Sequence, residues 1–288
     1  MRWHILCCLG APLNRLFVLF LLTTALAAAE PILILGAVPQ EIVPVVAALQ
    51  DPHEKLIEGI PCNTGTIGRH EVVIALTGVG KTNSAMVTTA LIIALHPPKA
   101  FMTGTAARIR KTVRTGDIII ASATVFHDAG SLTSDGMVQG KLADNGSLVA
   151  TTWFSPTRDR TNPFSFADSP ELVAYASDAA MRYVPESVVL DGKSYQPVVR
   201  VGTVVSGDLS GVTEAKIEDI RRKLDPDLME MESAGFAQVC QFYRVPHLVI
   251  RSGSNWAKEH NNDDYLRLSP IAARQAALFT VALVRGLP

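Results

Sequence analysis

Short apolar runs alternate with amphipathic stretches along most of this chain. The apolar runs have the composition of strands buried on both faces of a sheet, and they cover residues 31–38, 72–76, 100–103, 117–123, 198–205 and 247–250. Helical spacing of apolar residues predicts helices over residues 41–49, 82–95, 170–183, 212–224, 231–243 and 270–284. This alternation predicts a single α/β domain whose mixed, largely parallel central sheet is flanked by helices.

The first 29 residues have a different pattern. Arg2 and Arg15 precede an apolar run over residues 16–22, and small residues follow at positions 25 and 27–29. This order is typical of a secretory signal peptide. A retained anchor is the alternative, but the run is shorter than the ~20 residues of a membrane-spanning helix. We therefore expect residues 1–29 to be removed, residues 30–288 to form the domain without a stable membrane anchor, and the protein to be periplasmic or secreted.

Residues 130–170 interrupt the alternation. They are rich in Gly, Ser, Thr, Asp and Pro and carry the aromatic residues Trp153, Phe154, Phe164 and Phe166. A loop of this length inside a compact domain is usually functional or mobile. The sequence therefore predicts a variable loop at about residues 130–170.

Composition excludes several classes of protein. With 48% hydrophobic and 18% charged residues in 288, the chain can bury a full core. A formal net charge of −1 gives no electrostatic attraction to nucleic acid. The histidines are scattered without metal-ligand spacing, so we expect no metal and no cofactor. Cys62 and Cys240 remain after the signal; an exported protein could join them, but two buried free thiols are the favoured interpretation.

A glycine-rich turn at residues 78–82 raises the question of phosphate binding. The P-loop pattern requires another Gly five residues before Gly80, and that position is Ala75. The turn is better explained by close approach of its backbone, at Gly80, to a small ligand. Residues 202–207 also lack the glycine spacing of a nucleophile elbow, which argues against a serine hydrolase.

Six segments taken in chain order resemble one family, that of the 5′-methylthioadenosine/S-adenosylhomocysteine nucleosidases and the related nucleoside phosphorylases. The segments are LGAVPQE at 35–41, TGVGK at 77–81, TGTA at 103–106, VSGD at 205–208, MEME at 229–232 and VIRSGSN at 249–255. The resemblance implies the nucleoside phosphorylase fold, a purine nucleoside as substrate, cleavage of its N-glycosidic bond and assembly as a homodimer.

The resemblance also implies roles for individual residues. Glu41 resembles the carboxylate that orients the attacking water, and Glu232 the acceptor for the ribose 2′ and 3′ hydroxyls, with Met231 packing on the sugar. Thr105 and Arg108 are expected on the water side, in the loop after the strand at 100–103. These roles suit a reaction that passes through an oxocarbenium-like ribosyl cation. Acids in a first helical turn also favour the helix dipole without any catalytic role.

The sequence departs from the family pattern in two places that are expected to contact the purine base. Asn255 stands where the adenine-cleaving nucleosidases have an aspartic acid that protonates purine N7, and an amide cannot give up a proton. The resemblance associates asparagine here with 6-oxopurines, where the amide contacts N7 and O6. Ser210 and Gly211 replace an aromatic and an aliphatic residue of the base pocket. Stacking on the purine then falls to other aromatic residues, namely Trp256, Trp153 or Phe154.

Three functions remain open at this point. The first is a purine nucleosidase that uses water. The second is a phosphate-dependent purine nucleoside phosphorylase, in which Arg108, Arg110 and Arg114 would bind phosphate. The third is a non-catalytic nucleoside-binding protein similar to the plant bark storage proteins. The presence of both Glu41 and Glu232 favours an enzyme, because a binding protein has no need to orient water.

Overall fold

The computed structural model describes residues 30–139, 141–144, 147–150, 164–258 and 262–288. Within them ten strands form one mixed sheet in the order β11-β6-β14-β15-β5-β1-β4-β3-β2, and β16 pairs with both β5 and β6. These strands are β1 (Ile32–Gly36), β2 (Gln50–Ile57), β3 (Ile60–Ile67), β4 (His70–Leu76), β5 (Ala100–Arg108), β6 (Ile118–Phe126), β11 (Ser165–Ala167), β14 (Val199–Ser206), β15 (Leu228–Glu230) and β16 (His247–Trp256). The predicted signal peptide, Trp153 and Phe154 lie outside the described residues.

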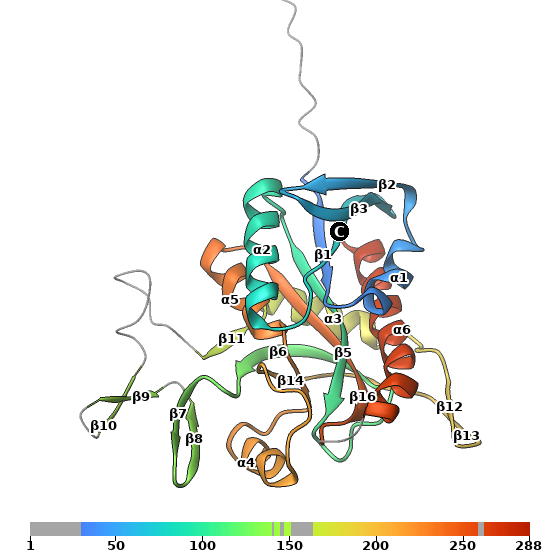
Figure 1. Ribbon diagram of the computed structural model, residues 1–288. Coiled ribbons are helices and arrows are strands. Elements are labelled where there is room, and N and C mark those ends of the chain that lie inside the picture. The colour runs from blue at the N-terminus through green and yellow to red at the C-terminus, as the bar shows by residue number, and fades with distance from the viewer. Residues whose placement is uncertain (1–29, 140, 145–146, 151–163, 259–261) are drawn as a thin grey trace, which may run out of the picture.

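Helices cover both faces of the sheet (Figure 1). One layer holds α2 (Lys81–Leu95) and α5 (Ser233–Tyr243), which lie side by side, and the other holds α1 (Pro39–Val46), α3 (Pro170–Ala180) and α6 (Asn262–Gly286). A further helix, α4 (Glu214–Leu224), packs with β14 and β15 in a smaller apolar cluster. The α/β architecture with a mixed sheet between helices is therefore confirmed.

The strands at the centre of the sheet bring distant segments together. β1 and β16 each run parallel to β5, so the residues at their carboxyl ends lie at the same edge. Arg251 pairs in register with Gly104, and Ser252 with Thr105. The register then shifts between Gly253 and Trp256, which places Asn255 in an irregular part of β16. Ligands of open α/β sheets bind at such carboxyl edges.

Several sequence predictions differ from the structure. β5 continues to Arg108, so Thr105 and Arg108 lie on a strand and not in a loop. The helix expected at residues 231–243 begins at Ser233, because Glu230 ends the short strand β15. The edge hairpin β2–β3 was not predicted, since every residue of β2 before Ile57 is exposed and the segment lacks an apolar signal.

The described parts of the segment at residues 130–170 include short strands. They form the hairpins β7 (Gly130–Thr133) with β8 (Gly136–Gln139) and β9 (Lys141–Asp144) with β10 (Ser147–Ala150), which project from the body of the molecule (Figure 1), and the strand β11. A last hairpin pairs β12 (Val188–Leu190) with β13 (Lys193–Tyr195). Cys62 on β3 and Cys240 on α5 are both buried free thiols, as expected. No helix among the described residues is long and apolar enough to cross a membrane.

Candidate active site

A cavity of about 500 Å³ opens at the carboxyl edge of β1, β5, β15 and β16. Its lining comes from six separate parts of the chain: Ala37, Val38, Glu41, Val79, Thr105, Ala106, Ala107, Leu209, Ser210, Gly211, Met229, Glu230, Met231, Glu232, Ser254, Asn255, Ala257, Lys258, Asn262 and Tyr265. The site residues predicted from sequence therefore converge, apart from Gly80 and Trp256, which are not among the lining residues. A largely preformed concave site with a few converging polar groups is typical of small-molecule binding.

Glu41 is fixed at the floor of this cavity. Pro39 begins α1, and two residues later the Glu41 carboxylate turns back to accept hydrogen bonds from the backbone N–H of Ala37 (2.7 Å) and Val38 (3.3 Å). Its other oxygen accepts from the Thr105 backbone N–H (2.7 Å) and hydroxyl (3.0 Å). The side chain is only 2% exposed. Four donors hold one buried carboxylate in one orientation, which suits a group that must direct a reacting water.

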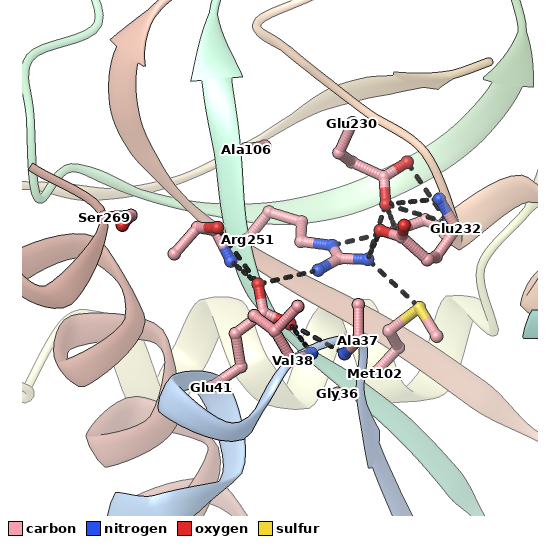
Figure 2. A network of polar contacts seen from close by, with 12 residues as sticks. Gly36, Ala37, Val38, Glu41, Met102, Ala106, Glu230, Glu232, Arg251 and Ser269 are labelled. Carbon is pink, nitrogen blue, oxygen red and sulfur yellow. Dashed lines mark hydrogen bonds and ion pairs between the residues drawn. The ribbon is translucent and has the colours of Figure 1, made fainter. Parts of the chain in front are cut away.

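Arg251 lies at the centre of three buried carboxylates, as Figure 2 shows. Its Nη2 donates to Glu230 (2.5 Å) and lies 3.4 Å from Glu232, and its Nη1 lies 3.6 Å from Glu41. The guanidinium is fully buried, and the Nη1 group has no hydrogen-bond partner among the described residues. Arg251 was not among the residues predicted for the site, although it stands in one of the six family-like segments.

Glu230 is the structural anchor of this network. Its carboxylate accepts from the Ser206 hydroxyl, from the Ser233 hydroxyl (2.9 Å) and from the backbone N–H of Glu232 (3.0 Å). Together with the contact to Arg251, these bonds give both carboxylate oxygens of Glu230 partners within the protein. Glu230 is therefore occupied by the protein and positions Arg251 and Glu232.

Glu232 is less completely bonded. One carboxylate oxygen accepts from the Gly80 backbone N–H (2.9 Å), and the other faces Arg251. Burial, followed by the neighbouring Glu230 charge, raises the pKa of Glu232 to about 8, although Arg251 opposes the shift. A buried carboxyl that faces a cavity and has spare acceptor capacity can bind hydroxyl groups of a ligand.

The glycine-rich turn positions the Gly80 N–H. At the start of α2 the Lys81 backbone N–H donates to Asp208 (2.8 Å), and the Lys81 ammonium binds Asp128 (2.7 Å). Asp128 also accepts from the Asp208 backbone N–H (2.9 Å). Gly80 adopts φ +98°, a conformation that side chains rarely allow. The turn allows the Gly80 N–H to approach the Glu232 carboxylate closely, and the predicted approach to a small ligand stays a prediction.

Asn255 lines the same cavity as Ser210 and Gly211. Its Oδ1 accepts from the Ser254 hydroxyl (3.0 Å), and its Nδ2 donates to the Trp256 carbonyl (3.1 Å). One N–H of the amide remains to donate to a ligand. The Trp256 indole N–H instead donates to Glu214 (3.3 Å), away from the cavity.

The three arginines considered for phosphate binding are engaged elsewhere. Arg110 pairs with Asp225 (3.0 Å) and Asp227 (2.7 Å), and Arg114 pairs with Asp117 (3.3 Å). Arg108 donates to the Val113 carbonyl at 3.5 Å and does not line the cavity, contrary to the expected place on the water side. Tertiary ion pairs that the sequence does not reveal account for the cluster.

Comparison with known proteins finds a matching family. The family described as the Phosphorylase superfamily matches residues 31–285. A 5′-methylthioadenosine/S-adenosylhomocysteine nucleosidase of Geobacillus sp. is 27% identical over 258 residues, which cover 89% of this chain and 98% of that protein.

Two solved structures have a similar fold. The nucleosidase from S. pneumoniae with the transition-state inhibitor MT-ImmA has a TM-score of 0.71 at 26% identity and covers 90% of this chain and 100% of its own. Futalosine hydrolase of Helicobacter pylori has a TM-score of 0.71 at 25% identity, with 90% and 98% covered.

Proposed function

Because the chain belongs to the phosphorylase superfamily, we propose that it is a purine nucleosidase, an enzyme that hydrolyses the N-glycosidic bond of a purine nucleoside. The observation that carries this proposal is that Glu41 and Glu232 line a single cavity and that the buried Arg251 contacts both of them. The relatives named nucleosidase match nearly their whole length, which supports the same reaction class.

The geometry indicates how the reaction proceeds. Glu41 lines the cavity and can accept a hydrogen bond from a water that enters it, while the buried Arg251 Nη1 group, 3.6 Å from the Glu41 carboxylate, stabilises the charge of that carboxylate. Glu232 accepts the ribose 2′ and 3′ hydroxyls and, when ionised, stabilises the positive charge that develops on the sugar. The bond from C1′ to purine N9 breaks, water adds to C1′, and Glu41 takes the proton of that water.

Hydrolysis is favoured over phosphorolysis by the charges of the site. A bound phosphate would lie beside Glu41, Glu230 and Glu232, and Arg251 is already shared among these carboxylates. Arg110 and Arg114 are paired with aspartates and do not reach the cavity. Water has no charge, so it suits this acidic surrounding better than phosphate does.

A nucleoside panel tests the proposal. The purified protein is incubated with adenosine, methylthioadenosine, inosine, guanosine and xanthosine, with and without phosphate, and the products are identified. Free ribose or its 5′-substituted form, produced at a rate independent of phosphate, is expected. Formation of ribose 1-phosphate would establish phosphorolysis instead, and absence of turnover on every nucleoside would favour a binding or storage protein.

Asn255 supports a preference for 6-oxopurines. Its free N–H can donate to O6 or N7 of such a base, whereas it cannot protonate a departing adenine. In Asn255→Asp the carboxyl would face the Trp256 carbonyl at the distance of the present hydrogen bond, 3.1 Å, which favours the protonated acid. We expect this variant to reverse a wild-type preference for inosine over methylthioadenosine in competition assays. A wild type that cleaves methylthioadenosine fastest contradicts the proposed preference.

Assembly and export complete the proposal. Val79 lines the cavity and is 48% exposed, and it precedes α2, whose Met86 and Ile93 are also exposed. These apolar residues support a homodimer whose partner covers the cavity mouth.

The signal-like residues 1–29 support export to the periplasm or beyond, and mass spectrometry of the secreted protein should find a chain that begins near Ala28 or Glu30. An intact amino terminus in the membrane fraction would contradict export.

A further inference from the structure

We infer that the Lys258 ammonium is a catalytic group that stabilises the departing purine as an anion, in place of proton donation to the base. This inference rests on the proposed nucleosidase function. Among the described residues that line the cavity, the charged side chains are those of Glu41, Glu230 and Glu232 and of one cation, Lys258. Its role concerns the leaving group and not the attacking water.

The backbone places Lys258 beside the base-binding residues. The Trp256 carbonyl accepts both the Asn255 side-chain amide (3.1 Å) and the Lys258 backbone N–H (2.8 Å), so the two residues are arranged around one oxygen atom. Lys258 also forms a β-bridge with Val212, which directly follows the lining residues Ser210 and Gly211. Lys258 therefore lies at the end of the cavity where Asn255 meets the base.

Among the described lining residues, no cation other than Lys258 lies near the base-binding residues. Arg251 is fully buried and bonded among Glu41, Glu230 and Glu232 at the sugar end, so its charge is matched there. No ion pair of Lys258 occurs among the described residues, and the side chain is exposed to the cavity and solvent. Among the described lining residues near Asn255, namely Ser210, Gly211, Ser254, Ala257 and Lys258, all but Lys258 are neutral toward a leaving group that becomes negative.

The chemistry balances without a proton donor. When the bond from C1′ to N9 breaks, both electrons stay on the purine, and in a 6-oxopurine the charge spreads to O6 and N7. The Lys258 ammonium and the Asn255 N–H stabilise this anion, and Lys258 keeps its proton throughout. Water supplies the hydroxyl at C1′, Glu41 takes the proton from it, and the released purine anion is protonated by solvent.

The test compares Lys258→Met and Lys258→Arg with wild type on the nucleoside that wild type cleaves fastest. Lys55→Met on the exposed strand β2 is the matched control. We expect Lys258→Met to lower kcat roughly 100-fold with little change in KM, since the group acts on charge that develops in the transition state. Lys258→Arg should recover most of kcat, and the loss in Lys258→Met should be larger for inosine than for adenosine, because only inosine places negative charge on O6.

Opposite results overturn the inference. A Lys258→Met enzyme that keeps kcat within about threefold of wild type, or an arginine variant no better than the methionine variant, excludes a role for this cation. If wild type cleaves a nucleoside at a rate that Lys258→Met leaves unchanged, the proposed function stands and only the role of Lys258 fails. If wild type cleaves none of the panel, both fail.

Discussion

Arg251 contacts both of the carboxylates that have a proposed role in the reaction. One end of its guanidinium contacts Glu41, which is proposed to orient water, and the other contacts Glu232, which is proposed to hold the ribose. A fully buried cation among three carboxylates is stable only when its partners remain in place. Changes to any one of these carboxylates should therefore alter both catalysis and the protonation of the others.

Glu41→Gln separates water activation from binding. The amide keeps the size of the side chain but cannot accept a proton, so we expect kcat to fall roughly 10²- to 10⁴-fold. The dissociation constant for a nucleoside should change little, because Glu41 scarcely touches the base. Kinetics and calorimetric binding measure both quantities, with Glu71→Gln on the exposed side of β4 as the control. A variant with full turnover would exclude Glu41 from this role.

Glu232 predicts a pH dependence of stability. Its pKa is raised to about 8 in the folded protein by burial and by Glu230, from 4.5 in an exposed glutamate. Between these values the folded state holds a proton that the unfolded chain has lost. The free energy of unfolding should therefore fall as pH rises from about 4.5 to 8, by at most about 1.4 kcal/mol per pH unit, and then level off.

Urea unfolding of wild type and Glu232→Gln at several pH values measures this effect. The glutamine does not titrate, so the difference in stability between the two proteins should shift toward the variant as pH rises through this range. Parallel pH curves for the two proteins would show that Glu232 does not bind its proton as the burial argument requires.

At the scale of elements, strand β5 brings together the residues that surround the proposed position of the attacking water. Its register with β16 sets Gly104 opposite Arg251, and its next residue, Thr105, supplies two donors to Glu41. A Cβ atom on Gly104 would lie 2.3 Å from the Arg251 Nη1 and 2.4 Å from a Glu41 carboxylate oxygen. The strand therefore needs glycine here so that the two side chains can meet across it.

Gly104→Ala is expected to separate this pair. The methyl group cannot fit beside two buried charged groups, so activity should fall strongly and the free energy of unfolding should drop by roughly 1 to 3 kcal/mol, as for other overpacked sites. Steady-state kinetics and thermal unfolding measure the two effects. An alanine variant with wild-type kcat would show that the contact of Arg251 with Glu41 is not needed for turnover.

At the scale of the whole molecule, the layer of α2 and α5 carries an unusual outer surface. Met86 and Ile93 lie two helical turns apart on α2 and are 61% and 54% exposed, and Phe242 on α5 is 43% exposed. With Val79 at the cavity mouth, this face offers an apolar surface next to the site. It is the surface that we expect to be covered in the proposed homodimer.

Met86→Glu tests that assembly. A charge buried at the centre of a subunit contact without a partner should convert a dimer to a monomer, and it should raise KM because Val79 and the cavity mouth lose their cover. Light scattering after size-exclusion chromatography gives the mass, with Leu56→Glu on the exposed strand β2 as the control. A wild-type protein that is monomeric at all concentrations would contradict the proposal.

The sequence by itself predicted the central elements and several of the cavity residues. Continuous apolar runs indicate the strands β1, β4 and β6, because burial on both faces leaves a continuous apolar signal, and helical spacing indicates the helices that cover them. Glu41, Glu232 and Asn255, which were assigned from their motifs, all line one cavity.

Only the tertiary structure decided how those residues act on one another. Arg251 is followed along the chain by small polar residues, and nothing local indicates that it lies among Glu41, Glu230 and Glu232. Glu41 belongs to α1, and the other two lie at the end of β15 and the start of α5, which the sheet brings together with Arg251 on β16. The same holds for Arg110, whose aspartate partners Asp225 and Asp227 are more than a hundred residues away. Spacing along a chain records periodicity within an element, whereas charge pairing between elements depends on the register and order of the strands.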